Sequence, residues 1–146
     1  MTFQQMPGHY IRRLQQVAVA AFMQRVAGAL TPVQFATLAA LREQGACDQA
    51  RVAALIGYDR ATLGDVIDRL EARGWIARAP GTRDRRTKVV SLTSAGRTVL
   101  RRVEHDVRRA QDDVLQPLAA RERRQFERLC RKLLRAHEAE ASADLG

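Results

Sequence analysis

The chain is poor in the residues that brace small secreted folds or build metal sites. It contains two cysteines, Cys47 and Cys130, which are far apart, and its three histidines show no short Cys or His spacing. This pattern predicts reduced thiols, no disulfide framework, no metal and no cofactor. A chain of 146 residues can bury a core without such supports, so we expect it to fold as one domain.

Long apolar runs and catalytic groupings are also missing. No stretch of about 18 apolar residues occurs, and the first residues lack the order of a signal peptide. We therefore expect a cytoplasmic protein with no membrane partner. No nucleophile with its base, no paired carboxylates and no set of metal ligands stands out, so the sequence predicts no enzyme.

Acidic residues are outnumbered by basic ones. There are 25 Lys and Arg against 16 Asp and Glu, a formal net charge of +9. This excess favours a polyanionic partner, either nucleic acid or acidic lipid, and composition alone does not choose between them. From Ile76 to Ser91 there are five basic residues and one acidic residue, so nearly half of the excess lies in one segment.

Apolar residues at three- and four-residue steps predict a first helix from Gly8 to about Ala27. Thr31 and Gln34 have the spacing of a capping box for a second helix, in which each side chain bonds a backbone amide of the other residue. Gly45 can end that second helix in a left-handed conformation.

Two short helices joined through a glycine should follow. Asp48 can cap the first, Gly57 offers the tight turn, and Asp59 can cap the second, an arrangement typical of a helix-turn-helix. Outward positions of the second helix offer hydrogen-bond donors, an acceptor and a methyl group, as base reading requires. These positions are Arg60, Ala61, Thr62, Gly64, Asp65, Asp68 and Arg69.

The helical period stops after Gly74. β-forming side chains flank a polar centre, Ala79 to Lys88, which predicts a hairpin with a basic tip. A long helix should then begin at Thr93 or Ser94 and end before Pro117, and a further helix should carry an apolar stripe. The small and polar residues 139–146 predict a disordered tail.

The hairpin segment resembles a known signature. Asp84-Arg85-Arg86, followed by a strand and by Leu92-Thr93 with Gly96, is similar to the Asp-x-Arg and Leu-Thr-x-x-Gly pattern in the wing of MarR-family regulators. The resemblance covers about residues 30 to 100. It implies a mainly α fold with a small β-hairpin wing: a winged helix-turn-helix lobe over 31–93 and dimerisation helices over 8–30 and 94–138.

This resemblance implies a homodimer bound to double-stranded DNA. Arg86 occupies the position of the minor-groove arginine, and we expect Asp84 to hold it through a charge-assisted hydrogen bond. The expected DNA-binding residues are Arg60, Ala61, Thr62, Asp65, Arg69, Arg83, Asp84, Arg85, Arg86 and Lys88.

Regulators of this family commonly release DNA when a small aromatic or phenolic molecule enters a cleft between the dimerisation helices and the lobe. The resemblance therefore implies an effector, with a hydroxylated benzoate or nicotinate as candidates, and arginine suits a carboxylate. The expected ligand residues are His9, Tyr10, Arg13, Phe22 and Tyr58. The competing interpretation places His9 and Tyr10 in the dimer interface, pairs Arg13 with an acid of the partner chain, and makes Phe22 a core residue.

The resemblance thus implies a repressor of aromatic-compound catabolism that a ligand releases from a pseudopalindromic operator. Two alternatives to this function stay open. Some relatives sense peroxide through a cysteine, although neither Cys47 nor Cys130 has a clear activating cluster. A winged helix can also bind nucleic acid without sequence preference.

Overall fold

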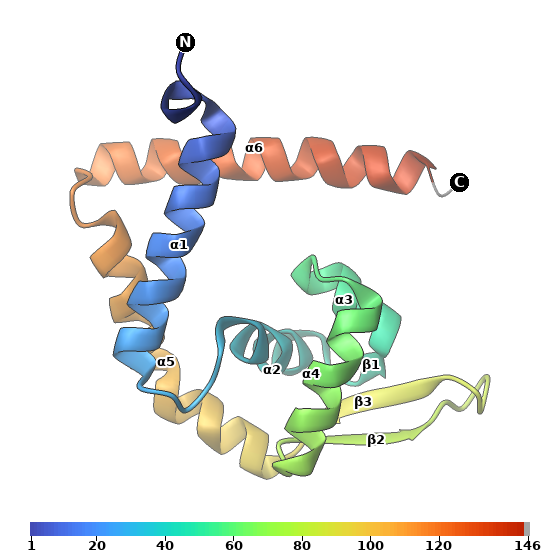
Figure 1. The fold of residues 1–146 in the computed structure, drawn as a ribbon. Coiled ribbons are helices and arrows are strands. Elements are labelled where there is room, and N and C mark those ends of the chain that lie inside the picture. The colour runs from blue at the N-terminus through green and yellow to red at the C-terminus, as the bar shows by residue number, and fades with distance from the viewer. Residues whose placement is uncertain (145–146) are drawn as a thin grey trace. The chain divides into compact units, whose positions relative to one another are not determined.

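Helices occupy most of the chain, and a small sheet interrupts them midway (Figure 1). The computed structural model describes residues 1–144, which form two compact units that divide between Gln111 and Asp112. In chain order the elements are η1 (Phe3–Gln5), α1 (Pro7–Val26), α2 (Pro32–Gln44), β1 (Cys47–Asp48), α3 (Gln49–Ile56), α4 (Arg60–Ala72), β2 (Ile76–Pro80), β3 (Lys88–Leu92), α5 (Ser94–Leu115) and α6 (Ala120–Asp144). The predicted fold class is confirmed.

The predicted caps form at the starts of α2, α3 and α4. The Thr31 hydroxyl accepts from the Gln34 amide at 3.2 Å, and the Gln34 side chain accepts from the Thr31 amide at 3.0 Å. Asp48 and Asp59 each accept from the amide three residues on, at 2.8 and 3.1 Å. Gly57 ends α3 in the left-handed region, with φ +67°. The turn between α3 and α4 is therefore fixed by Gly57 and the Asp59 cap, whereas Asp48 fixes the start of α3.

The sheet has the order β1–β3–β2 and is antiparallel throughout. Ile76 pairs with Leu92 and Pro80 with Lys88, so β2 and β3 form the predicted hairpin. Pro80 lies at the end of an edge strand, where its missing amide costs no ladder bond. The two-residue strand β1, in which Cys47 pairs with Val90, was not predicted, because two residues carry no readable alternation.

One hydrophobic core holds the elements of the first unit together. It joins the last two turns of α1 to the inner faces of α2, α3 and α4, the sheet, and α5. Its fully buried members include Leu38, Leu41, Val52, Leu63, Ile67, Leu70, Val90 and Leu100. Thr37, a polar residue on α2, is also fully buried, and its hydroxyl donates to the Val33 carbonyl at 2.8 Å.

The second unit contains the end of α5 and the helix α6. Glu122 caps α6 by accepting from the Ala119 amide at 2.9 Å, and Arg123 pairs with Asp112 at 3.2 Å. The helix continues to Asp144, which corrects the expected disordered tail over 139–144; positions 145 and 146 lie outside the described residues. The reason is composition, because the Glu and Ala residues from 138 onward are strong helix formers. No helix among the described residues is long and apolar enough to cross a membrane.

Candidate nucleic-acid interface

The helix α4 is anchored on one side and open on the other. Leu63, Ile67 and Leu70 are fully buried at three- and four-residue steps, so the opposite face of the helix turns to solvent. Arg60 and Ala61, expected to contact DNA, lie exposed in its first turn. The helix therefore presents its N-terminal turn at the surface, as a recognition helix does.

The hydroxyl of Thr62 is already engaged. It donates to the Asp59 carboxylate at 2.9 Å, and the Thr62 amide donates to the same oxygen at 3.1 Å. These bonds, the hydroxyl one first, hold the pKa of Asp59 below its ordinary value. Thr62, expected to read bases, keeps only acceptor capacity on that hydroxyl while the bond to Asp59 lasts.

Two acidic residues near the end of α4 pair with an arginine of the wing. The Arg78 guanidinium, on β2, forms an ion pair with Asp68 and a second one with Glu71 at 3.2 Å. These two hydrogen bonds raise the pKa of Arg78 above its ordinary value. The pairing, here called the Arg78 clasp, ties the wing to α4 and offsets the negative charge of Asp68. The sequence showed Arg78 only as one basic residue among five.

The wing tip is a tight, internally bonded loop between β2 and β3. The Gly81 amide donates to the Thr87 carbonyl at 2.7 Å, and the Thr87 amide donates to the Asp84 carbonyl at 3.1 Å. The Asp84 side chain accepts from the backbone amide of Arg86 at 3.0 Å. This corrects the expectation that Asp84 grips the guanidinium: Asp84 orders the turn, because its carboxylate reaches the amide two residues on.

Basic side chains project from this loop. Arg83, Arg85 and Arg86 are exposed, as are Asp84 and the first residue of β3, Lys88. The hairpin extends away from the lobe (Figure 1). The arrangement places a narrow arginine-bearing loop beside a recognition helix, which is what minor- and major-groove contacts require together.

The Leu-Thr-x-x-Gly segment is a junction between the wing and α5. The Thr93 hydroxyl donates to the Gly74 carbonyl at 2.6 Å and accepts from the Gly96 amide at 3.1 Å. The Thr93 amide donates to the Trp75 carbonyl at 3.1 Å. One threonine thus joins the end of α4, the wing and the start of α5.

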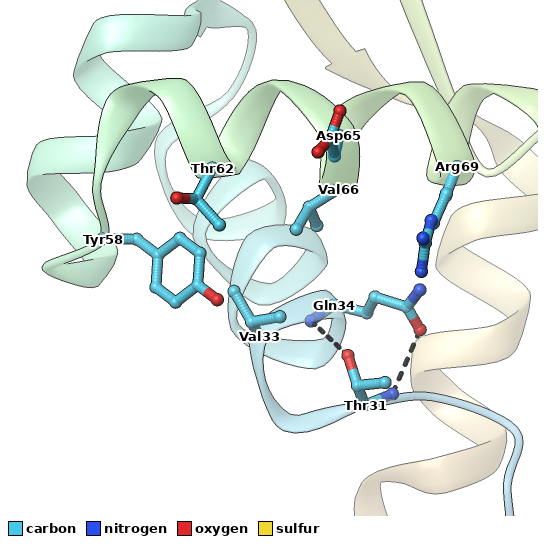
Figure 2. Close-up of a pocket in the computed structure, with 8 residues that line it drawn as sticks. All are labelled: Thr31, Val33, Gln34, Tyr58, Thr62, Asp65, Val66 and Arg69. Atoms are coloured by element: carbon cyan, nitrogen blue, oxygen red, sulfur yellow. Dashed lines mark hydrogen bonds between the residues drawn. The ribbon is translucent and has the colours of Figure 1, made fainter.

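A pocket of about 300 Å³ lies between α4 and the start of α2 (Figure 2). Figure 2 shows Tyr58 and Arg69 at its two ends, with Val33 and Gln34 opposite α4. Its lining is Thr31, Val33, Gln34, Tyr58, Thr62, Asp65, Val66 and Arg69. Tyr58 was expected at a ligand site, whereas Thr62, Asp65 and Arg69 were expected on DNA. The residues at the start of α2 were not foreseen, because their capping pattern gave them a structural role.

The other expected ligand residues lie elsewhere. His9 packs edge-on against Phe3 and Tyr10, with ring centroids 5.4 and 6.4 Å apart, and Arg12 contacts its Nδ1 at 2.9 Å. Arg13 donates to Gln16 instead of joining that group.

Phe22, also expected at a ligand site, is buried in the core beside Phe35, with ring centroids 6.1 Å apart. An aromatic side chain on the inner stripe of a helix gains more from core packing than from an open cleft. Tyr58 is thus the expected ligand residue that the structure places in a pocket.

Each unit contains one of the two cysteines. Cys47 and Cys130 are both half-buried free thiols. Burial raises the pKa of Cys47, and the Asp48 carboxylate raises it further while Arg51 lowers it. A raised pKa leaves less thiolate, which argues against redox sensing at Cys47. Among the residues that the structure describes, no cluster of His, Cys, Asp and Glu could hold a metal ion.

Comparisons with known proteins agree on the fold and the family. The MarR family model matches residues 30–88. The HTH-type transcriptional repressor NicR of Pseudomonas putida is 33% identical over 132 residues, which cover 90% of this chain and 84% of NicR. Because these relatives regulate transcription, they point away from an enzymatic activity.

Two solved structures superpose closely. That of BpsR from Bordetella bronchiseptica, which concerns the regulation of its DNA binding by 6-hydroxynicotinic acid, has a TM-score of 0.87 and 35% identity, covering 91% of this chain and 96% of BpsR. PcaV of Streptomyces coelicolor in complex with its natural ligand has a TM-score of 0.87 and 34% identity, covering 94% and 97%. The chain therefore belongs to the MarR family of winged helix-turn-helix transcriptional regulators.

Proposed function

We propose that the protein is a homodimeric repressor that binds a pseudopalindromic operator and leaves it when a small aromatic acid binds. One observation carries the DNA part of this proposal. The open face of α4 and the arginine-bearing wing belong to one lobe with one core, and the Arg78 clasp joins them. A helix and a loop held in this way can enter neighbouring grooves of a duplex together.

Exposed apolar rows support the homodimer. On α1 the side chains of Tyr10, Ile11, Leu14 and Val17 are exposed, and on α6 those of Phe126, Leu129, Leu133 and Leu134. Each row follows helical spacing, and such continuous apolar surface is typical of an interface. A second copy of the chain would bring a second recognition helix, and two helices meet half-sites about one helical turn apart.

The pocket between α4 and the start of α2, here called the Tyr58 pocket, and the relatives both support an aromatic acid as effector. The pocket combines an aromatic ring, the apolar Val33 and Val66, and the guanidinium of Arg69, which can hold a carboxylate. BpsR responds to 6-hydroxynicotinic acid, a ligand of this chemistry. A ligand here touches α4 directly, so it can shift the recognition helix. The aromatic cluster at the start of α1 is the competing site.

The DNA proposal is tested with duplex DNA from the region upstream of the protein's own gene. Wild type should bind this DNA in the presence of excess random competitor. Arg86→Ala should weaken binding by about 1–3 kcal/mol if Arg86 enters the minor groove. Arg102→Ala, an exposed arginine of α5, is the matched control and should bind as wild type does. Equal affinity for upstream and random DNA would favour a non-specific nucleic-acid-binding protein instead.

The ligand proposal is tested by calorimetry with a panel of hydroxylated benzoates and nicotinates. Arg69→Ala should abolish the heat of binding if the carboxylate sits in the Tyr58 pocket, and Arg13→Ala should abolish it if the α1 cluster holds the ligand. A binding heat that neither variant changes would reject both sites. The acid that binds should also release operator DNA from wild type.

A further inference from the structure

A second hollow, of about 390 Å³, lies where α3, α4 and the wing meet. Its walls come from the first turn of α3, at Gln49 and Ala50, from Arg60 at the start of α4, and from Arg86 and Lys88 where the wing returns to β3. Arg60 lies more than 20 residues before Arg86 and Lys88 in the sequence, so the fold itself gathers these basic residues around one space.

The charge in this hollow lacks a counter-ion. Arg60, Arg86 and Lys88 each carry a positive charge, and among residues 1–144 no carboxylate forms an ion pair with any of them. Asp48 also lines the hollow, but it accepts from the Arg51 amide as the cap of α3. The hollow therefore has an excess of positive charge, and the positive end of the α3 dipole adds to it.

The geometry of the DNA grooves indicates which part of a duplex would occupy this hollow. In a duplex a single sugar-phosphate strand separates the major groove from the adjacent minor groove. If α4 enters the major groove and the wing enters the minor groove, that strand must pass between Arg60 and the base of the wing. The hollow is the gap between those two elements.

We infer that this hollow binds backbone phosphates of the strand between the two grooves, held by Arg60 and Lys88. The inference rests on the proposed DNA-binding function and deepens it. It changes the expected role of Arg60, which becomes a phosphate contact and not a reader of bases. A phosphate contact fixes register on the duplex but carries no sequence information, so Arg60 and Lys88 should supply affinity without specificity.

The test measures affinity for operator and random duplexes by fluorescence anisotropy between about 50 and about 200 mM salt. Arg60→Gln and Lys88→Gln should each reduce the slope of log affinity against log salt by about 0.9, the loss of one phosphate contact. Both variants should weaken operator and random DNA by the same factor, so that the ratio of the two affinities stays at the wild-type value. Arg102→Gln removes an exposed charge outside the hollow and should leave the slope unchanged.

Two results would overturn the inference. One is an unchanged salt slope in both hollow variants; the other is a loss of operator preference in Arg60→Gln, which is the mark of a base reader. A third result would be that wild type binds operator and random DNA equally while both variants still reduce the salt slope. That result would contradict the proposed repressor function but support phosphate binding in the hollow.

A second readout separates a DNA phosphate from a free phosphate ion. The backbone amide resonances of Gln49 and Ala50 are followed by NMR in the full chain. Addition of duplex should shift them, whereas inorganic phosphate at the same ionic strength should not. A shift with inorganic phosphate and none with duplex would assign the hollow to a small anion and reject the inference.

Discussion

At the residue scale, the glycine of the Leu-Thr-x-x-Gly segment, Gly96, lies where there is no room for a side chain. A Cβ there would collide with the Trp75 carbonyl oxygen and stand 2.6 Å from Leu92 Cδ1. We expect Gly96→Ala to lower the free energy of unfolding by about 1–3 kcal/mol, the usual cost of overpacking, as measured by urea denaturation. Gly8→Ala is the control, because a Cβ at Gly8 meets nothing within 4 Å. Equal stability of the two variants would show that the junction can yield.

A second prediction at the residue scale concerns how the contribution of Asp59 to stability depends on pH. Because its folded pKa is lowered, its contribution to stability is present above the ordinary Asp pKa and is lost as the pH falls through the folded value. Thr62→Val removes the hydroxyl bond and keeps the backbone one, so the pKa of Asp59 should rise part of the way back. NMR titration of the carboxyl carbon measures this shift. An Asp59 that titrates identically in the variant would show that the hydroxyl bond is not formed in solution.

At the scale of elements, the Arg78 clasp decides whether α4 and the wing act as one body. Its partners are partly exposed, so the clasp should add only about 0.2–1 kcal/mol to stability. Its larger effect should be on operator affinity, because a loosened wing must be ordered again on DNA. Arg78→Ala and Asp68→Asn should each weaken operator binding, and the double variant should be no weaker than Arg78→Ala alone. Additive losses of affinity in that cycle would mean that the two residues act separately.

Elements with strong local signals were predictable from the sequence. The caps at Thr31, Asp48 and Asp59 and the end of α3 at Gly57 all form as their residue types require. The three-stranded sheet of the described chain was not foreseen in full, because β1 exists only through its pairing with β3. The Arg78 clasp and the hollow beside Arg60 could not be predicted from the sequence for a related reason. Each depends on tertiary contacts between elements that have no common sequence pattern.

At the scale of the whole molecule, the proposed repressor must be a dimer, since one lobe reads only half of a pseudopalindrome. Each half-site contact alone is weak, and joining two lobes makes the second contact intramolecular, which can raise affinity by about 10²–10⁴-fold. The exposed apolar row on α6 follows helical spacing, as an interface that joins two chains would require. Leu133 is 58% exposed in the single chain, so replacing it should not disturb a core.

Leu133→Glu should therefore shift the protein from dimer to monomer in sedimentation experiments, because a buried carboxylate without a partner is costly in an interface. Affinity for the full operator should fall toward that for a single half-site, while half-site affinity itself stays the same. Lys132→Gln makes the same change in net charge on the neighbouring residue and serves as the control. Full operator affinity in a monomeric Leu133→Glu variant would show that one lobe suffices and would remove the basis for the dimer.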